Sequence, residues 1–138
     1  MNSSISDAFL YFKQGNDCFK SEKFSEAENF YQQAILLLPT NTTIQFRLGL
    51  TYYQLKEFEK AKTQFEKVLS LDHHFKNVNQ CLANTLLELR DHETALHYYF
   101  RQLESEPWFE THYNIGVLYM MKDRFKEALI YFEQALQK

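Results

Sequence analysis

The sequence predicts an all-α fold, built as a tandem array of four helical hairpins, and three observations support this. Small residues recur every 33 or 34 positions, aromatic residues recur at the same interval, and the chain has only 3 glycines and 2 prolines among 138 residues. A fixed period of this length is typical of repeat proteins. The scarcity of glycine and proline disfavours turn-rich β folds, so the repeated element is helical.

Two sets of small residues mark the two helices of each repeat. The first set is Gly15, Gly49, Ala83 and Gly116, and the second is Ala27, Ala61, Ala95 and Ala128. Small side chains let two helix axes approach closely. An aromatic residue follows each alanine of the second set by one helical turn: Tyr31, Phe65, Tyr99 and Phe132. We expect these rings to fill the space between hairpins.

The period divides the chain into an N-terminal tail and a single array. The tail covers residues 1–7 and the array covers 8–138, with repeats at 8–41, 42–75, 76–108 and 109–138, the last one incomplete. In each repeat two apolar-periodic stretches flank a polar break, which predicts turns near 22–23, 56–57, 90–91 and 123–124. Pro39 and Pro107 end helices, and Thr40 or Asn41 supplies the N-cap of the next one.

Composition and charge exclude several classes of function. The net charge is −3 and neither half is basic, so the chain lacks the charge that nucleic-acid binding needs. The longest apolar run, around 115–121, is too short to cross a membrane. Cys18 and Cys81 lie far apart, which favours free thiols in a reducing compartment, and the N-terminus carries no signal-peptide pattern. We therefore expect a cytoplasmic protein.

No residue pattern indicates catalysis or metal binding. His73 and His74 are adjacent, and His92 and His97 miss the i, i+4 spacing of zinc-binding helices. The glycines are committed to the repeat, so no phosphate-binding loop is present, and the carboxylates occur in mixed surface patterns. The sequence predicts a protein that is not an enzyme and that needs neither a metal nor a cofactor.

The recurring residues resemble the tetratricopeptide repeat family, whose period is 34 residues. The pairs that carry the resemblance are Gln14-Gly15, Leu48-Gly49, Leu82-Ala83 and Ile115-Gly116. It covers residues 8–138 and implies a right-handed α-solenoid whose first helices line a concave groove. The third repeat departs most from the pattern, with His92 and Gln102 where apolar residues are preferred. We expect looser packing there.

The resemblance also implies which residues line a peptide-binding groove. They are Phe12, Lys13, Asn16, Phe19, Phe46, Arg47, Leu50, Tyr53, Gln80, Asn84, Tyr113, Asn114 and Val117. Exposed aromatic residues call for a cover, and asparagine side chains can hold a guest backbone. The alternative is that individual aromatic residues simply pack between helices. The family's carboxylate clamp for chaperone C-termini is not expected, because only Asn16 fits its five positions.

These observations predict a scaffold or adaptor that binds a segment of another protein in the groove. Basic residues in the first half favour a segment with apolar anchors and one acidic end. The alternative is an N-terminal substrate-recognition or oligomerisation module of a larger enzyme, such as a transferase. The last helix leaves Leu129, Leu136 and part of Phe132 without a following helix. This predicts either a longer array or docking on a second copy of the chain.

Overall fold

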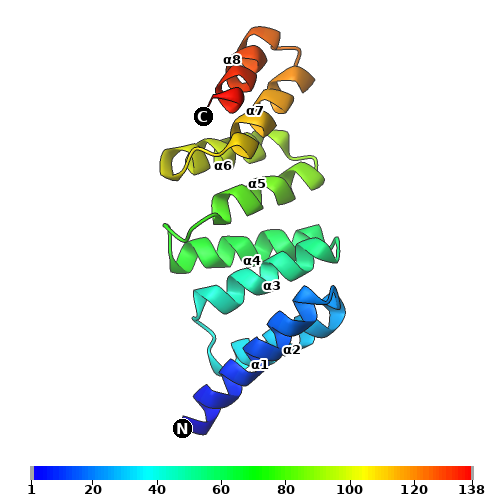
Figure 1. Ribbon diagram of the computed structural model, residues 1–138, viewed down its shortest axis with the longest axis vertical. Helices are drawn as coiled ribbons and strands as arrows, with labels where there is room; N and C mark the ends of the chain where they lie inside the picture. Colours follow the sequence, from blue (N-terminus) through cyan, green and yellow to red (C-terminus); the bar gives the residue numbers. More distant parts are fainter. Residues whose placement is uncertain (1, 138) are drawn as a thin grey trace. The chain divides into compact units, whose positions relative to one another are not determined.

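The computed structural model describes residues 2–137, and this part of the chain contains eight α-helices and no strand. In order they are α1 (Asn2–Lys20), α2 (Phe24–Leu37), α3 (Thr42–Gln54), α4 (Phe58–Leu71), α5 (Val78–Glu88), α6 (His92–Ser105), α7 (Phe109–Met121) and α8 (Phe125–Leu136) (Figure 1). The predicted all-α class is confirmed. The four predicted turns fall between α1 and α2, α3 and α4, α5 and α6, and α7 and α8.

The first helix begins earlier than the repeat pattern predicts. Residues 2–7, expected as a tail, are helical, and α1 is 19 residues long whereas the other helices have 11 to 14. No glycine or proline separates this segment from the first repeat. Nothing in its sequence therefore stops the helix at the repeat boundary.

The chain divides into two compact units, which we describe separately. Compact unit 1 ends at Val78 and contains α1 to α4; compact unit 2 begins at Asn79 and contains α5, from its second residue, to α8. Each compact unit thus holds two repeats. The helices of a hairpin run side by side in opposite directions, as α1 with α2 and α7 with α8 show in Figure 1.

Close contact within the hairpins explains the recurring small residues. A Cβ atom added to Gly49 would lie 2.6 Å from Cε1 of Phe65, and one added to Gly15 would lie 2.7 Å from Cε1 of Tyr31. Gly116 meets Phe132 in the same way. Tyr31, Phe65 and Phe132 therefore each lie against the glycine of their own hairpin. The second set of small residues, the four alanines, is fully buried.

The hairpin turns share one backbone conformation without using glycine. The residues with positive φ in these turns are Glu22, Lys56, Arg90 and Asp123, with φ between 60° and 66°. In the second turn the amide of Lys56 donates to the carbonyl of Tyr53 at 3.0 Å, and the amide of Glu57 donates to that of Tyr52 at 2.9 Å. This pair of bonds satisfies carbonyls that the end of a helix leaves free.

The connection between the first two repeats follows the prediction from Pro39. Helix α2 ends at Leu37, two residues before the proline. Asn41 then caps α3, since its Oδ1 accepts a hydrogen bond of 3.1 Å from the amide of Ile44. The predicted N-cap at Asn41 is confirmed.

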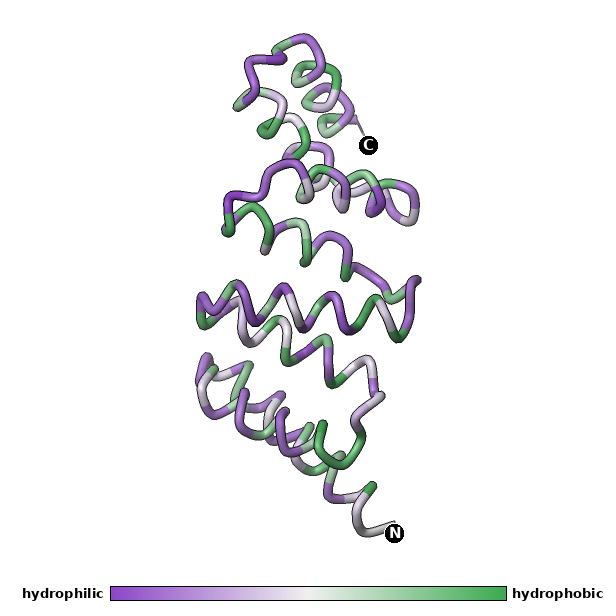
Figure 2. The backbone as a smooth tube through the Cα atoms, turned by 180° about the vertical axis from the view of Figure 1, so that it is seen from behind, coloured by the Kyte–Doolittle hydropathy of each residue, from purple (hydrophilic) through white to green (hydrophobic). Residues whose placement is uncertain are grey.

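Surface features match an array of amphipathic helices. Hydrophilic and hydrophobic residues follow one another along the helices in Figure 2. Between residues 2 and 137, no helix combines the length and the hydropathy that crossing a membrane requires. Cys18 and Cys81 are free thiols, and His73 and His74 are exposed in the connection after α4.

Candidate functional site

The residues expected in a groove lie on the first helix of each repeat. In compact unit 1 they form what we call the α1–α3 face: Phe12, Lys13, Asn16, Phe19, Phe46, Arg47, Leu50 and Tyr53. In compact unit 2 they form the α5–α7 face: Gln80, Asn84, Tyr113, Asn114 and Val117. The two faces are described one after the other.

The aromatic residues of the α1–α3 face are partly buried, and each also packs within its compact unit. The ring centroid of Phe12 lies 5.9 Å from that of Tyr31, and that of Phe46 lies 5.8 Å from that of Phe65. Phe19 and Tyr53 make edge contacts with phenylalanines of the following helices, at 5.2 and 5.3 Å. These rings therefore contribute to packing within compact unit 1, and part of each ring remains exposed to solvent.

Asn16 has a structural partner on the second helix of its hairpin. The Tyr31 hydroxyl donates a hydrogen bond of 2.5 Å to Oδ1 of Asn16. The carbonyl of this amide is thus engaged, and its Nδ2 group remains as the donor for a ligand. Burial raises the pKa of Tyr31 to about 12, while the positive charge of Arg47 acts in the opposite direction.

Sequence reasoning missed Tyr31 as a member of this site, although a signal was present. The first and third repeats pair asparagine with tyrosine, as Asn16–Tyr31 and Asn84–Tyr99. The second and fourth repeats place Leu50 with Phe65 and Val117 with Phe132 at the same positions. At this repeat position the ring therefore carries a hydroxyl only where an amide oxygen on the first helix can accept its hydrogen bond, as burial of a polar group requires.

The basic residues of the α1–α3 face differ in their partners. Lys13 forms an ion pair of 3.5 Å with Asp17, one turn along α1, and both side chains are exposed. Arg47 is partly buried, and its guanidinium carbon lies 5.6 Å from the ring centroid of Phe19. The ion pairs within residues 2–137 do not include Arg47.

The α5–α7 face is built around a network of neutral polar side chains. The Tyr99 hydroxyl donates to Oδ1 of Asn84 at 2.5 Å, and Nδ2 of Asn114 donates to the Tyr99 oxygen at 3.3 Å. Gln80 donates to Oδ1 of Asn84 at 3.4 Å and accepts from the Thr111 hydroxyl at 2.6 Å. Only 3% of Gln80 is exposed, so this predicted groove residue is mainly a link inside the network.

Apolar side chains lie next to this network on α7. Tyr113 is 49% exposed, and its ring stacks on that of Phe109, with centroids 6.1 Å apart and planes 9° apart. Val117, one turn further along α7, is partly buried. Phe109 is exposed as well, although the sequence analysis did not include it among the groove residues. The α5–α7 face thus combines amide groups with an open apolar patch.

Comparison with known proteins identifies the repeat. Family models described as tetratricopeptide repeat match residues 8–41, 43–75 and 109–138. Together these segments cover more than half of the chain. They leave out the whole of the third repeat, residues 76–108, which departs most from the sequence pattern.

Curated relatives extend well beyond the length of this chain. The anaphase-promoting complex subunit 6 of Arabidopsis thaliana is 27% identical over 80% of this chain and 22% of its own length. The peroxisomal targeting signal receptor of Saccharomyces cerevisiae is 31% identical over 90% and 22%. The protein O-mannosyl-transferase F38B6.6 of Caenorhabditis elegans is 27% identical over 67% and 13%. The chain spans less than a quarter of the length of each.

Solved structures share the fold at low sequence identity. The crystal structure of MamA aligns with a TM-score of 0.90 at 19% identity, over 94% of this chain and 77% of that one. The first tetratricopeptide repeat domain of Spaghetti (RPAP3), bound to the HSP90 peptide SRMEEVD, aligns with a TM-score of 0.82 at 23% identity, over 86% and 95%.

Proposed function

Because the chain belongs to the tetratricopeptide repeat family, we propose that it is a scaffold or adaptor that binds an extended segment of a partner protein. The α1–α3 face and the α5–α7 face are each a site for such a segment. The observation that carries the proposal is the pairing, on each face, of apolar side chains with amide groups. Leu50 and Val117 offer apolar contact. Nδ2 of Asn16 offers a donor to the guest backbone, and Oδ1 of Asn114, whose Nδ2 already donates to Asn84 and Tyr99, offers an acceptor.

The relatives support the same kind of activity. The structure of the Spaghetti domain contains a bound peptide, and the yeast relative is a receptor for a targeting signal. The proposal for this chain therefore concerns a peptide segment as the ligand. It includes a cytoplasmic location and no need for metal, cofactor, nucleic acid or membrane; the net charge of −3 supports the exclusion of nucleic acid.

The test uses a phage-displayed library of random peptides, selected on the intact chain. Selected peptides are then measured by fluorescence anisotropy against Leu50→Gln and Val117→Gln, which place polar groups on the two faces. Glu66→Gln, at an exposed position of α4 outside both faces, is the control. We expect the double variant Leu50→Gln/Val117→Gln to lose at least about tenfold in affinity and Glu66→Gln to retain it.

Nuclear magnetic resonance on the isotope-labelled chain provides the second readout. Peptide binding should shift the backbone amide signals of α1, α3, α5 and α7. Shifts confined to α2, α4, α6 and α8, or the failure of the chain to enrich any peptide, would contradict the proposal.

A second candidate function is that of a recognition or oligomerisation module in a larger enzyme. The nematode O-mannosyl-transferase is the observation that favours it, since this chain corresponds to 13% of that protein. Both candidates use the same faces. Sequencing the full transcript distinguishes them, because coding sequence that continues into a catalytic domain favours the second candidate.

A further inference from the structure

We propose that Arg47 binds an acidic side chain within the partner segment, so that the α1–α3 face selects a carboxylate flanked by apolar residues. This inference rests on the proposed function and names the partner chemistry that the site prefers. The α5–α7 face, which has a neutral asparagine at the equivalent position, is assigned no preference for acidic residues.

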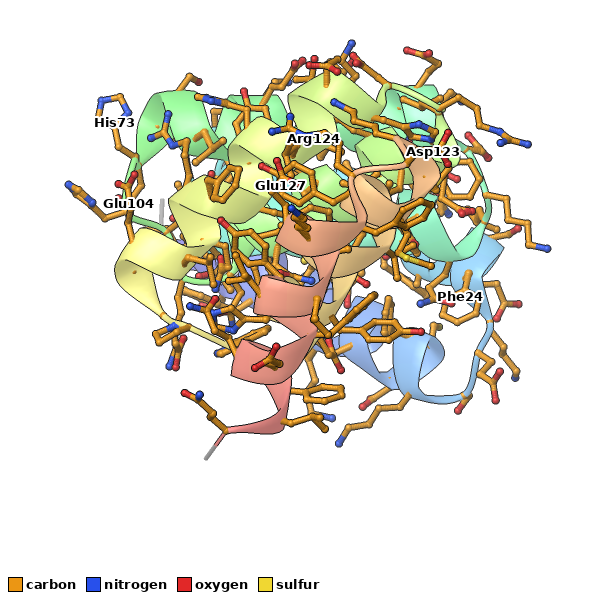
Figure 3. The ribbon with its side chains drawn as sticks, turned by 90° about the horizontal axis from the view of Figure 1, so that it is seen from above. Phe24, His73, Glu104, Asp123, Arg124 and Glu127 are labelled. Atoms are coloured by element: carbon orange, nitrogen blue, oxygen red, sulfur yellow. The ribbon has the colours of Figure 1, made fainter. Side chains whose placement is uncertain are left out.

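Arg47 and Arg124 both stack on aromatic rings, but within residues 2–137 only one of them has an ion pair. Arg47 lies over Phe19, and Arg124 lies over Tyr119 at 5.2 Å from its ring centroid. Arg124 also has a carboxylate partner, because its Nε donates to Glu127 at 2.9 Å (Figure 3). Arg47 has the stacking without an ion pair in the described part of the chain. Its guanidinium edge therefore remains available to an external carboxylate.

Equivalent positions of the two compact units carry side chains of different charge. Arg47 and Asn114 are each the sixth residue of their repeat, and each follows a repeat with an asparagine–tyrosine pair. In compact unit 2, Asn114 donates a hydrogen bond to the tyrosine of that pair. In compact unit 1, the charge of Arg47 acts on the corresponding hydroxyl of Tyr31. The same place is thus cationic in one compact unit and neutral in the other.

The charge at this place fits a side-chain carboxylate better than other anions. A guanidinium presents parallel donors that match the two oxygens of one carboxylate. Phosphorylated segments are usually held by clusters of arginines, and the α1–α3 face as defined holds a single arginine, Arg47. A terminal carboxylate is disfavoured because the chain keeps only Asn16 of the five residues in the family's clamp.

The test repeats the phage selection with Arg47→Asn, which gives this repeat position the same residue that the α5–α7 face has at Asn114. In the library, the C-terminus of every peptide is fused to the coat protein, so enriched carboxylates come from side chains. Peptides selected by the wild type should be enriched in aspartate or glutamate, and this enrichment should disappear with Arg47→Asn. Asn114→Arg should increase it. Circular dichroism confirms that each variant folds, and Arg47→Gln serves as a second variant.

Binding measurements then isolate the contact. Replacing the enriched acid of a selected peptide by its amide should lower affinity for the wild type about tenfold and for Arg47→Asn less than about twofold. Lys67→Asn, which removes an exposed cation on α4 outside both faces, should behave as the wild type. Peptides enriched without acidic residues, or acid enrichment that persists in both Arg47 variants, would overturn this inference and leave the proposed function intact. The absence of any enriched peptide would remove both.

Discussion

The hydroxyl of Tyr31 donates a 2.5 Å hydrogen bond to Oδ1 of Asn16 across the first hairpin. Tyr31 is fully buried, and its ring also lies against Gly15. The second repeat replaces the asparagine and the tyrosine together by Leu50 and Phe65. Two solutions to the same packing problem thus occur in one chain, one polar and one apolar.

This relationship predicts strong non-additivity. Asn16→Leu should lower the free energy of unfolding by about 1–3 kcal/mol, because it leaves a buried hydroxyl without an acceptor. Tyr31→Phe should lower it by about 0.5–1.5 kcal/mol. The double variant Asn16→Leu/Tyr31→Phe recreates the second-repeat pair, so it should be more stable than Asn16→Leu alone. Urea denaturation of the four proteins measures the cycle, and simple addition of the two losses would contradict the pairing.

The repeat itself could be predicted from the sequence because its packing rules are local. Close contact requires a small residue at one position and a ring at another, and Gly49 with Phe65 shows that geometry at 2.6 Å. The pattern therefore located helices and turns to within a few residues. It failed at α1, where a helix-permissive segment before the first repeat extends the helix to Asn2.

The candidate site was less predictable because it depends on contacts between helices. The pattern placed Gln80 in the groove, yet its amide binds Asn84 and Thr111 inside compact unit 2. It treated Arg47 as one of several basic residues. In the structure Lys13 has an ion-pair partner, Asp17, whereas Arg47 stacks on Phe19. Which polar group already has a partner is decided by distance in space, and the sequence period does not contain that information.

Gln102 provides a prediction about the departure of the third repeat from the pattern. Its side chain is 1% exposed, and neither its Nε2 nor its Oε1 has a hydrogen-bond partner among the described residues. Gln102→Met keeps the approximate volume and removes both polar atoms. We expect a gain of about 1–3 kcal/mol in the free energy of unfolding, measured by chemical denaturation.

Gln64 is the matched control for this substitution. It is also buried, but its Nε2 donates to Oε1 of Gln45, whose own Nε2 donates to the carbonyl of Pro39 at 2.8 Å. Gln64→Met should therefore destabilise the protein, since it leaves the Gln45 oxygen without its donor. Equal effects of the two substitutions would show that hydrogen bonding does not distinguish the two positions.

Cys81 predicts a loss of stability at alkaline pH. Burial raises the pKa of the Cys81 thiol to about 12 in the folded chain, whereas a cysteine in the unfolded chain has a pKa of about 8.5. Between these values the unfolded chain has lost a proton that the folded chain retains. The free energy of unfolding should therefore fall by up to about 1.4 kcal/mol per pH unit above about pH 8.5.

The measurement compares the wild type with Cys81→Ala by urea denaturation from neutral pH upwards. The variant lacks the thiol, so its stability should decline less steeply in the alkaline range, while below about pH 8 the difference between the two proteins should be constant. Thiol labelling gives a second readout, in which Cys81 reacts slowly in the folded chain and faster in urea. Parallel alkaline slopes would contradict the assignment.

The last helix predicts weak self-association through one of its sides. Leu129 and Leu136 on α8 are 57% and 78% exposed, whereas Leu96 and Leu103, at the same repeat positions of α6, are partly buried. Phe132 contributes less than the sequence analysis expected, because its ring contacts Tyr113 at 5.7 Å and lies against Gly116. Two exposed leucines favour a second copy of the chain as a cover, since burying each is worth about 1.5–3 kcal/mol.

Two copies bring four such leucines to the contact, and association itself costs at least about 4 kcal/mol. The net gain is therefore at most about 8 kcal/mol, which corresponds to a dissociation constant no tighter than about 10⁻⁶ M. Sedimentation velocity should therefore show a coefficient that rises with concentration. Leu129→Lys/Leu136→Lys should keep it constant, because a charge at each position opposes burial. Ile130→Lys changes an exposed residue of the same helix outside this pair and should associate like the wild type. A wild-type coefficient independent of concentration, or equal effects of the two variants, would assign the exposed leucines no role in self-association.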